Sequence, residues 1–412
     1  MKDDDGAAAA PRRSVSAGGV ASYVLIAASV VLAWQIVLQP LLQRAPVGAA
    51  IRLAPTSPLV LRRAAESELA AGRTDNAAAL SREALVRAPF DVRALRVAGL
   101  AEARGGREAQ ADALLTLAGN WSLRDDPAHA WLIQYRLKQG DYGSAFAHAD
   151  TLARRREDVW PQIFHLFTLA GTEDPQRALP VITGLLAAAP PWRNAYLASL
   201  SETPQDLTVA IQLAILLQAS REPLTKGELK RLYNTLLSKR LYAALGATRA
   251  QLNRPTRSAV TNGGFADDDA PEPFQWRLAQ KAGVIAEVVA DDLRPDNPAL
   301  RVDYDGYANA SVAQQLTFLA AGAYRFSAEA RIEAGDAERL AWTLVCVPGG
   351  KGITSFPVSA AGSTRTAWAT QSAEFQIPAD CPAQWLRLET RAGERRSPVV
   401  VWFDRVEISP LS

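Results

Sequence analysis

A continuous apolar run marks the N-terminal part of the chain. From Val20 to Leu38 the sequence reads VASYVLIAASVVLAWQIVL and contains no charged residue. About 20 apolar residues, at a rise of 1.5 Å each, match the ~30 Å hydrocarbon thickness of a bilayer. The run therefore predicts a transmembrane helix over 20–42, ended by Pro40, with a disordered tail over 1–19 and a linker over 43–57. A cleaved signal peptide is the alternative, because Val47-Gly48-Ala49 resembles a small-residue cleavage site.

Beyond the linker, glycine and alanine recur with a fixed period. Gly72, Gly106 and Gly140 are 34 residues apart, and Ala77, Ala111 and Ala145 keep the same interval. In each unit the glycine is expected to end one helix in the left-handed conformation, and the alanine lets the next helix approach closely. The period predicts helix pairs that begin at Pro58, Val92 and Asp126. It weakens after residue 158, where apolar residues at i, i+3 and i+4 still predict about two irregular pairs and a capping helix up to 252.

After Pro255 the pattern changes from helical to alternating. Apolar and polar residues alternate in YRFSAEARI and LAWTLVC, and similar runs occur at FQWRL, VIAEVV, ALRVDY, VAQQLTFL, AEFQI, WLRLET and VVVWFDRVEI. Short alternating runs separated by Gly, Pro, Asp and Asn predict an antiparallel β-sandwich over 256–412. The predicted fold class is a multidomain chain, α then β, with one transmembrane helix, an α-solenoid and a sandwich.

Charge and cysteine content add information about partners and compartment. The chain carries 45 Lys and Arg residues against 43 Asp and Glu residues, a balance that excludes a strong nucleic-acid footprint. Its two cysteines, Cys346 and Cys381, both lie in the predicted sandwich, where they are candidates for a disulfide in an oxidising compartment. Ala- and Arg-rich usage indicates a bacterium with a GC-rich genome. We therefore expect an inner-membrane protein, anchored by one span, with the bulk of the chain in the periplasm.

The 34-residue period, with its glycine and alanine columns, resembles the tetratricopeptide repeat. Ala65 and Gly99 match the small residue of the family's first helix, whereas Ile133 does not, and most consensus aromatic residues are missing, so the repeats are degenerate. The resemblance implies an inner groove that binds a protein partner. Its basic groove positions are Arg62, Arg93, Arg96, Arg104 and Lys138. These side chains are candidates for an acidic peptide or anionic glycan, and an ordinary solvated helix face is the alternative.

The order of features in the C-terminal part, from Asn262-Gly263-Gly264-Phe265 to Val401-Trp402-Phe403-Asp404, resembles jelly-roll carbohydrate-binding modules and galactose-binding-like domains. The resemblance implies that an exposed Tyr or Trp stacks on a sugar ring. The candidates are Tyr307 and Trp368, in polar surroundings, followed by Tyr304 and Trp385. Trp342 alternates in phase with Leu340 and Leu344 and is expected in the core.

No catalytic motif was found in the chain. It contains no nucleophile elbow, P-loop, dinucleotide fingerprint or zinc motif, so we expect no enzyme activity, cofactor or metal. The leading hypothesis is a membrane-anchored periplasmic scaffold that recruits a protein through its repeats and contacts glycan through its sandwich, in cell-surface polysaccharide assembly or export. The alternative is a structural assembly factor of an envelope complex, whose sandwich binds protein.

Overall fold

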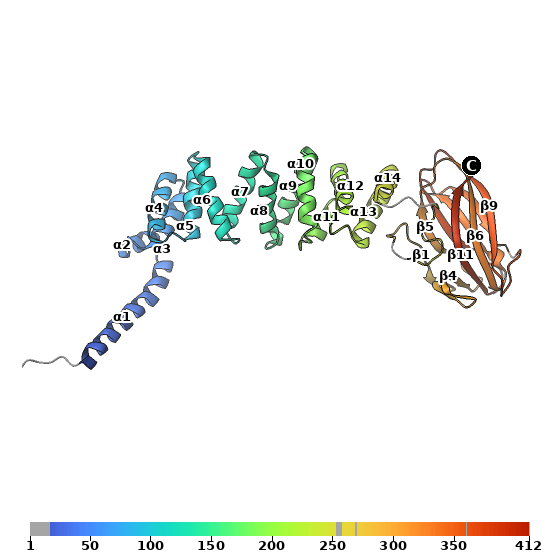
Figure 1. Ribbon diagram of the computed structural model, residues 1–412, viewed down its shortest axis with the longest axis horizontal. Coiled ribbons are helices and arrows are strands. Elements are labelled where there is room, and N and C mark those ends of the chain that lie inside the picture. Colours follow the sequence, from blue (N-terminus) through green and yellow to red (C-terminus); the bar gives the residue numbers. More distant parts are fainter. Residues whose placement is uncertain (1–16, 253–257, 268–269, 360, 412) are drawn as a thin grey trace, which may run out of the picture. The chain divides into compact units, whose positions relative to one another are not determined.

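The computed structural model describes residues 17–252, 258–267, 270–359 and 361–411 (Figure 1). The chain divides into two compact units, 1–152 and 153–412. In its described part, residues 17–152, the first unit contains helices and no strands. The second contains further helices and the β-sandwich, so the predicted order of α then β is confirmed.

The apolar N-terminal run forms helix α1, Ala17–Arg44. Within it, Val24–Arg44 has the length and mean hydropathy (2.0) to cross a membrane, a property that a signal sequence near the N-terminus shares. The expectation that Pro40 ends the helix is wrong, because Pro40 lies inside α1. The last turn is held instead by Arg63, whose guanidinium donates to the carbonyl oxygens of Leu42 and Ala45. These bonds satisfy carbonyls that have no partner within the helix.

The helices of the first unit follow the 34-residue period. A short helix α2, Val47–Leu53, precedes three antiparallel pairs. The pairs are α3 (Pro58–Ala70) with α4 (Thr74–Arg87), α5 (Val92–Arg104) with α6 (Glu108–Trp121), and α7 (Asp126–Lys138) with α8 (Tyr142–Ala153). The first helix of each pair begins at the predicted residue, so the register inferred from the sequence is confirmed.

Both columns of small residues have the predicted roles. Gly72, Gly106 and Gly140 have φ values of 76°, 76° and 69°, in the left-handed region that a residue with a Cβ adopts only with strain. Ala77, Ala111 and Ala145 are each 0 % exposed, at the point where the second helix of a pair crosses its neighbours. The small residues thus set both the turn and the close helix packing of each repeat.

The second unit continues with six helices rather than the expected two pairs and a cap. They are α9 (Trp160–Glu173), α10 (Pro175–Leu186), α11 (Arg193–Ser199), α12 (Pro204–Gln218), α13 (Lys226–Ser238) and α14 (Tyr242–Leu252). Thr203 and Thr225 begin α12 and α13 with capping boxes that include Asp206 and Glu228. Glu228 also accepts two hydrogen bonds from the buried Arg193, at 2.9 Å each, which joins α11 to α13.

The sandwich consists of two antiparallel sheets that face each other (Figure 1). The five-stranded sheet has the order β1-β5-β10-β7-β8, and the six-stranded sheet has the order β2-β3-β4-β11-β6-β9. The first sheet comprises β1 (Arg277–Leu278), β5 (Ser311–Thr317), β10 (Gln384–Thr390), β7 (Leu340–Cys346) and β8 (Gly352–Pro357). The second comprises β2 (Gln280–Lys281), β3 (Val284–Asp291), β4 (Arg294–Tyr304), β11 (Val399–Pro410), β6 (Gly322–Ala334) and β9 (Ala369–Ile377).

The alternating apolar residues of both sheets meet in one core between them. Leu344 and Leu386 from the first sheet and Val302 and Phe403 from the second are each 0 % exposed. Trp342 lies in the same core, 1 % exposed, as its phase predicted. Because successive residues of a strand point to opposite faces, the neighbours of these core residues lie on the two outer faces of the sandwich.

Part of the outer face of the five-stranded sheet packs against helices α12–α14. Phe274, just before β1, is 0 % exposed and contacts the ring of Tyr233 in α13, with 5.1 Å between the centroids. The guanidinium of Arg249 in α14 lies 4.0 Å from the centroid of Phe274. At the rim, Lys230 pairs with Glu272 at 2.9 Å. A shared apolar cluster, which includes Leu236, Leu245 and Leu316, therefore joins helices and sandwich.

Candidate functional site

Two of the four predicted sugar-stacking residues are covered by the protein itself. Tyr304 is 0 % exposed and its hydroxyl donates to the carbonyl of Arg391, so its ring belongs to the sandwich core. Trp385 lies on the outer face of β10, but it packs into the cluster that joins the sandwich to α12–α14. Tyr304 therefore presents no free face to a sugar, and its prediction as a stacking residue is wrong. Trp385 is half-buried, and its role in sugar binding stays a prediction.

Trp368 belongs to a stack of alternating arginine and tryptophan side chains over the six-stranded sheet. Arg301 lies 5.9 Å from the ring of Trp402, and Arg331 lies 4.7 Å from the same ring. Arg331 also contacts the ring of Trp368 at 5.9 Å, and Arg294 contacts it at 4.8 Å. The faces of the indoles are therefore engaged by cations, an arrangement that stabilises both groups.

Carboxylates fix this stack in place. Asp291, which is buried, accepts hydrogen bonds from the guanidinium of Arg331 at 2.9 Å and from the indole of Trp368 at 3.0 Å. Glu333 accepts from the indole of Trp402 at 2.8 Å. Trp402 is only 6 % exposed as a result. The stack therefore occupies the outer face over β4, β11 and β6, and its carboxylate partners hold both indoles in place.

The outer face of the five-stranded sheet carries an open cleft beside the area that the helices cover. Its volume is about 450 Å³, and it runs across β10, β7 and β8. Polar side chains line it beside the apolar Ile353, and they are Thr343, Thr354, Ser355, Glu389, Thr390 and Arg391. A hollow of this size accommodates a small ligand or a few residues of a polymer.

Thr343 and Ser355 in the cleft lining continue a row of polar residues on three neighbouring strands. Arg387 of β10 is the register partner of Thr343 in β7, which in turn pairs with Ser355 in β8. Thr343 alternates with the core residues Trp342 and Leu344, so its side chain lies on the outer face. At one side of the row, Arg391 donates to the Ser355 hydroxyl at 3.4 Å.

Two polar atoms in this row are buried without a hydrogen-bond partner among the described residues. They are Oγ1 of Thr343 and Nε of Arg387. Thr343 is only 8 % exposed. A buried donor or acceptor without a partner costs about 1–3 kcal/mol, which a ligand hydroxyl or a water molecule recovers. The cleft is therefore chemically suited to a ligand that both donates and accepts hydrogen bonds.

Tyr307 lies in the loop at the end of this cleft. The loop is bonded to the segment that follows β10, because the Thr390 hydroxyl donates to the carbonyl of Ala308 and the Ala392 N–H donates to the side chain of Asn309. Tyr307 is 53 % exposed, as its polar surroundings predicted. Of the four predicted aromatic residues, it is the one with a largely open ring. An exposed ring beside hydrogen-bonding groups is a suitable platform for the apolar face of a sugar.

The basic groove positions of the helical repeats form ion pairs within the protein. Arg62 pairs with Asp91 at 3.1 Å, and one repeat later Arg96 pairs with Asp125 at 3.4 Å. Both aspartates also cap the helix that follows them, α5 or α7. Each pair thus links a repeat to the next one, a role that the sequence analysis missed although Asp91 and Asp125 also recur after 34 residues.

Arg96 has a further contact, and the three remaining basic positions, Arg93, Arg104 and Lys138, differ in theirs. Arg96 has a second partner in Glu66, at 3.2 Å, and Arg104 donates to the carbonyl of Leu69 at 2.6 Å. Lys138 pairs with Glu108 at 3.4 Å on the surface. Arg93 is exposed at the start of α5. The exposed side chains of Arg93 and Lys138 are therefore the most accessible part of the predicted basic groove.

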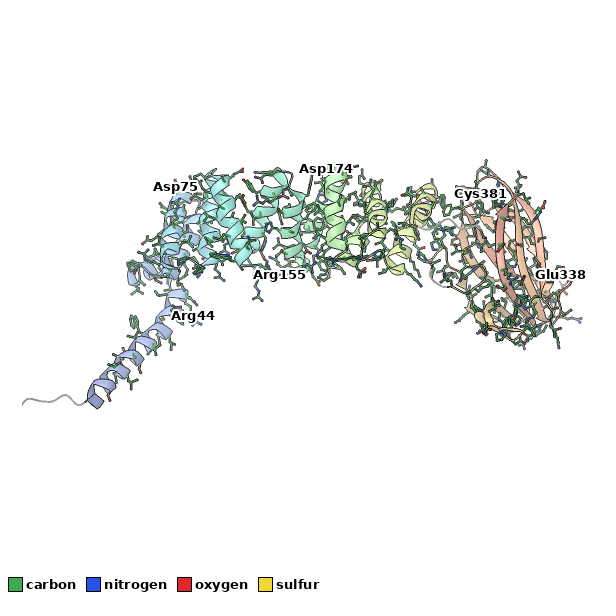
Figure 2. The ribbon with its side chains drawn as sticks, in the orientation of Figure 1. Arg44, Asp75, Arg155, Asp174, Glu338 and Cys381 are labelled. Atoms are coloured by element: carbon green, nitrogen blue, oxygen red, sulfur yellow. A yellow bond between two sulfur atoms is a disulfide. The ribbon has the colours of Figure 1, made fainter. Side chains whose placement is uncertain are left out.

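The predicted disulfide is confirmed. Cys346, at the end of β7, is bonded to Cys381, just before β10, with a Cα–Cα distance of 5.6 Å (Figure 2). The bond lies at the end of the five-stranded sheet away from Arg391, beside the buried side chain of Gln384. It ties the loop before β10 to β7 and so fixes the strand that carries Arg387.

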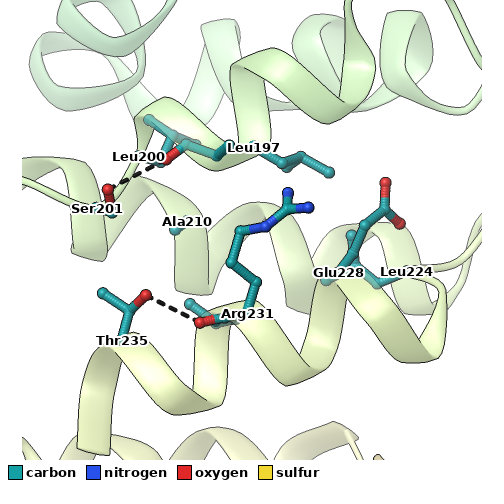
Figure 3. A pocket seen from close by; sticks show the side chains of 10 residues that line it. Leu197, Leu200, Ser201, Ala210, Leu224, Glu228, Arg231 and Thr235 are labelled. Carbon is teal, nitrogen blue, oxygen red and sulfur yellow. Dashed lines mark hydrogen bonds between the residues drawn. The ribbon is translucent and has the colours of Figure 1, made fainter. Parts of the chain in front are cut away.

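A hollow between α11, α12 and α13 is too small for a ligand. Its volume is about 30 Å³, the space of one water molecule, and the Arg231 side chain extends across it toward Leu197 (Figure 3). Thr235 beside it donates to the carbonyl of Arg231 at 2.9 Å. Within the described residues, no group of three or more His, Cys, Asp or Glu side chains is placed to hold a metal ion.

Comparison with solved structures shows what the sandwich resembles. A CBM4 structure is 18 % identical, with 37 % of this chain and 99 % of that chain covered and a TM-score of 0.29. The CBM22-1 xylan-binding domain of Xyn10C from Paenibacillus barcinonensis is 17 % identical, with coverage of 34 % and 87 % and a TM-score of 0.26. TmCBM61 in complex with β-1,4-galactotriose is 20 % identical, with coverage of 38 % and 100 % and a TM-score of 0.26.

All three are carbohydrate-binding modules, the class that the sequence pattern of the sandwich resembles. Similarities at these identities and TM-scores describe the fold and carry no argument about a ligand. No protein-family model and no curated protein matches the chain. The tetratricopeptide identity of the helices stays a prediction, supported by the 34-residue period.

Proposed function

We propose that the sandwich binds a segment of polysaccharide in the cleft over β10, β7 and β8. The observation that carries this proposal is Thr343 Oγ1, a buried atom in the cleft lining that has no hydrogen-bond partner among the described residues. Nε of Arg387, on the neighbouring strand beside Thr343, is buried without such a partner as well. Sugar hydroxyls donate and accept hydrogen bonds and so satisfy both atoms at once. Ser355, Glu389 and Arg391 supply further polar contacts, and Tyr307 supplies an aromatic surface at one end.

We further propose that the whole chain is a membrane-anchored scaffold of the bacterial periplasm. Helix α1 serves as the anchor, and the helical repeats recruit a protein partner in cell-surface polysaccharide assembly or export. The length and hydropathy of α1 support the anchor. The disulfide supports an oxidising compartment for the sandwich. Arg93 and Lys138 are the candidate contacts for an acidic segment of the partner.

The decisive variant for glycan binding is Thr343→Val, which removes the buried hydroxyl and keeps the shape of the side chain. We expect the affinity of the full chain for its polysaccharide to fall about tenfold, because one hydrogen bond is lost. We expect the melting temperature to stay the same or to rise, because an unpaired buried oxygen is removed. If the hydroxyl has only a structural role, the variant should keep its affinity and melt at a lower temperature. Affinity electrophoresis in native bacterial polysaccharides and calorimetry of the same samples measure both quantities.

Thr370→Val is the matched control, since Thr370 is exposed on β9 of the other sheet. It should change neither binding nor stability. If the full chain binds no native polysaccharide, and a deletion strain keeps normal surface glycan, the proposal is wrong.

The alternative function, a sandwich that binds protein, is favoured by one observation. Among the described strands, β8 is one of the two edge strands of the five-stranded sheet and pairs only with β7. An exposed edge accepts an added strand from a partner. A protein partner that is retained from membranes by the Thr343→Val and Tyr307→Ala variants, and is not displaced by sugar, supports this alternative.

A further inference from the structure

Exposed apolar side chains of the helical repeats are confined to one edge. Among residues 45–152, the exposed large hydrophobic side chains lie in α2, at the ends of α4 and α6, and in the loops that follow those two helices. We call this set the apolar edge, and its members are Ile51, Leu53, Val86, Phe90, Trp121 and Leu123. Val86 and Phe90 are each 80 % exposed, which is unusual for apolar residues that have no partner to cover them.

The connectivity of the repeats places these residues side by side. Short loops make the two helices of each pair antiparallel, so the starts of α3, α5 and α7 and the ends of α4 and α6 share one edge. The rings of Phe90, before α5, and Trp121, at the end of α6, confirm this arrangement with 5.5 Å between their centroids. The loops at the other edge contain Gly72, Gly106 and Gly140 and carry none of the exposed large hydrophobic residues.

Helix α1 reaches the repeats at this same edge. Leu42, near its end, packs with Ala50 of α2 and Val60 in the first turn of α3. Arg63, one turn further along α3, donates to the carbonyls of Leu42 and Ala45. The end of the candidate membrane span is therefore fixed beside the apolar edge and not at the opposite loops.

Exposed arginines accompany the apolar side chains. Arg52, Arg87, Arg93 and Arg124 all lie at or next to the apolar edge and are exposed. Two nearby acids, Asp91 and Asp125, cap helices and pair with Arg62 and Arg96. A third, Glu83, pairs with Arg87 itself at 3.1 Å on the exposed surface of α4. A surface with aromatic and aliphatic side chains between exposed arginines suits the boundary between lipid headgroups and acyl chains.

We propose that the apolar edge lies in the interface of the bilayer that α1 crosses, with anionic phospholipid as its partner. The proposal rests on the proposed membrane anchor, because α1 brings the edge to the lipid. Phe90, Trp121 and Leu123 enter the headgroup region, and the arginines bind lipid phosphates. Arginines near an anionic surface are attracted to it, so four of them make binding depend on lipid composition.

A fluorescent label on one introduced cysteine tests the proposal in the full chain. Cys346 and Cys381 are bonded to each other, so the variant Leu123→Cys offers a single reactive thiol for an NBD maleimide. Position 123 is 61 % exposed, and the change does not disturb a core. The control variant is Gln139→Cys, whose exposed side chain lies at the opposite edge, after α7. Both are reconstituted into vesicles with phosphatidylglycerol and with phosphatidylcholine alone.

The expected result is a blue-shifted NBD emission at position 123 that spin-labelled lipid quenches at least twofold more than at position 139. Arg124→Glu should reduce this quenching in phosphatidylglycerol vesicles and have little effect in phosphatidylcholine. Equal, weak quenching at both positions in chain that floats with the vesicles overturns the proposal and leaves the anchor intact. Emission at 123 that is shielded in native membranes but not in pure lipid shows a protein on the edge and also overturns it.

Flotation of the vesicles reports separately on the anchor. A chain that does not float, even from vesicles formed around it, contradicts the proposed function of α1. Added phosphatidylglycerol vesicles then still test the edge itself. Selective quenching at position 123 supports lipid binding without a span, and its absence overturns the present proposal.

Discussion

The glycines at positions 72, 106 and 140 show how far a single residue type can specify a repeat. Their φ values lie in the left-handed region, and a Cβ on Gly72 or Gly106 meets no atom within 4 Å. Backbone conformation, and not space, therefore requires glycine at these turns. This requirement is local, which explains why the sequence alone revealed it.

Replacement of Gly106 tests that argument. Gly106→Ala should lower the free energy of unfolding by about 1–2 kcal/mol, because a Cβ strains the left-handed conformation. Urea unfolding followed by circular dichroism measures the change. Gly143→Ala is the matched control, since Gly143 lies inside α8 and its added Cβ makes only an ordinary contact with Asp141 at 3.5 Å. That variant should gain about 0.5–1 kcal/mol, and equal effects at both positions contradict the explanation.

The fate of the aromatic residues illustrates what residue patterns can and cannot predict. Tyr304 shares its phase with Leu300 and Val302, so alternation within β4 already indicated a buried ring, and its choice as a sugar platform overlooked this. Trp385 has the opposite phase to Leu386 and Leu388 and does lie on an outer face. Helices from a distant part of the chain cover it, and no local pattern contains that information.

The important cleft residues were missed for a related reason. Thr343 and Arg387 occupy outward positions in LAWTLVC and WLRLET, which the alternation shows. Their meeting depends on the pairing of β7 with β10 across about 40 residues of intervening chain, and such pairing is not encoded in either strand alone.

At the scale of elements, long regular segments were predicted well and irregular ones were not. The starts of α3, α5 and α7 and most strands agree with the sequence patterns. Strand β8 was missed because GITSFP has little alternation, and it lies at an edge of the sheet. Helix α1 continues past Pro40 because contacts with α3 hold its last turn, which is again a long-range effect.

The pair α7–α8 should be sensitive to acid. His129 and His148 face each other with 3.0 Å between their Nδ1 atoms, and burial lowers the pKa of His148 to about 4, with the positive charge of His129 adding to the effect. Folding thus keeps His148 neutral, whereas the unfolded chain binds a proton near pH 6.5. Between pH 4 and 6.5 the unfolded state therefore binds more protons than the folded state. The contribution of neutral His148 to the free energy of unfolding is fully present above pH 6.5 and is lost as the pH falls toward 4.

Urea unfolding of the full chain in detergent at several pH values measures this dependence. His148→Gln should flatten the curve between pH 6.5 and 4, because glutamine does not titrate. His165→Gln, which changes the histidine in α9, is the control and should leave the slope unchanged. An unaltered slope in the His148 variant contradicts the assigned role.

The disulfide should stabilise the sandwich measurably. It closes a segment with a sequence separation of 35 residues, which corresponds to about 4 kcal/mol of loop entropy in the unfolded chain. A reductant should therefore lower the melting temperature of the sandwich. The double variant Cys346→Ala and Cys381→Ala should melt at that lower temperature with and without reductant. If the melting temperature of the wild-type chain does not change although its disulfide is fully reduced, the estimate is contradicted.

At the scale of the whole molecule, the order of parts was predicted and the contacts between parts were not. Composition and periodicity located the change from helices to strands near residue 255. They gave no indication that Phe274 enters a cluster with Tyr233 and Arg249, where burial lowers the pKa of Arg249 to about 10. The sequences of α13, α14 and the segment before β1 each contain a mixture of apolar and polar residues, and none of them indicates its partner.

Removal of Phe274 should uncouple the sandwich from the helices before it. Phe274→Ala deletes a fully buried ring at the contact and should cost about 3–5 kcal/mol. In calorimetry we expect one shared transition of α12–α14 and the sandwich to separate into two. Phe403→Ala removes an equally buried ring from the sandwich core. It should lower stability by a similar amount without that separation, and identical traces for both variants contradict a specific role of the contact.

The contact between the sandwich and helices α13 and α14 determines how a force on the sandwich is transmitted. Under the proposed function, tension on a polysaccharide bound in the cleft acts on β10 and β7 first. The same sheet bears on α13 and α14 through Phe274, Arg249 and the Lys230–Glu272 pair. Under that proposal, tension on the sandwich passes into α13 and α14 through this packed contact.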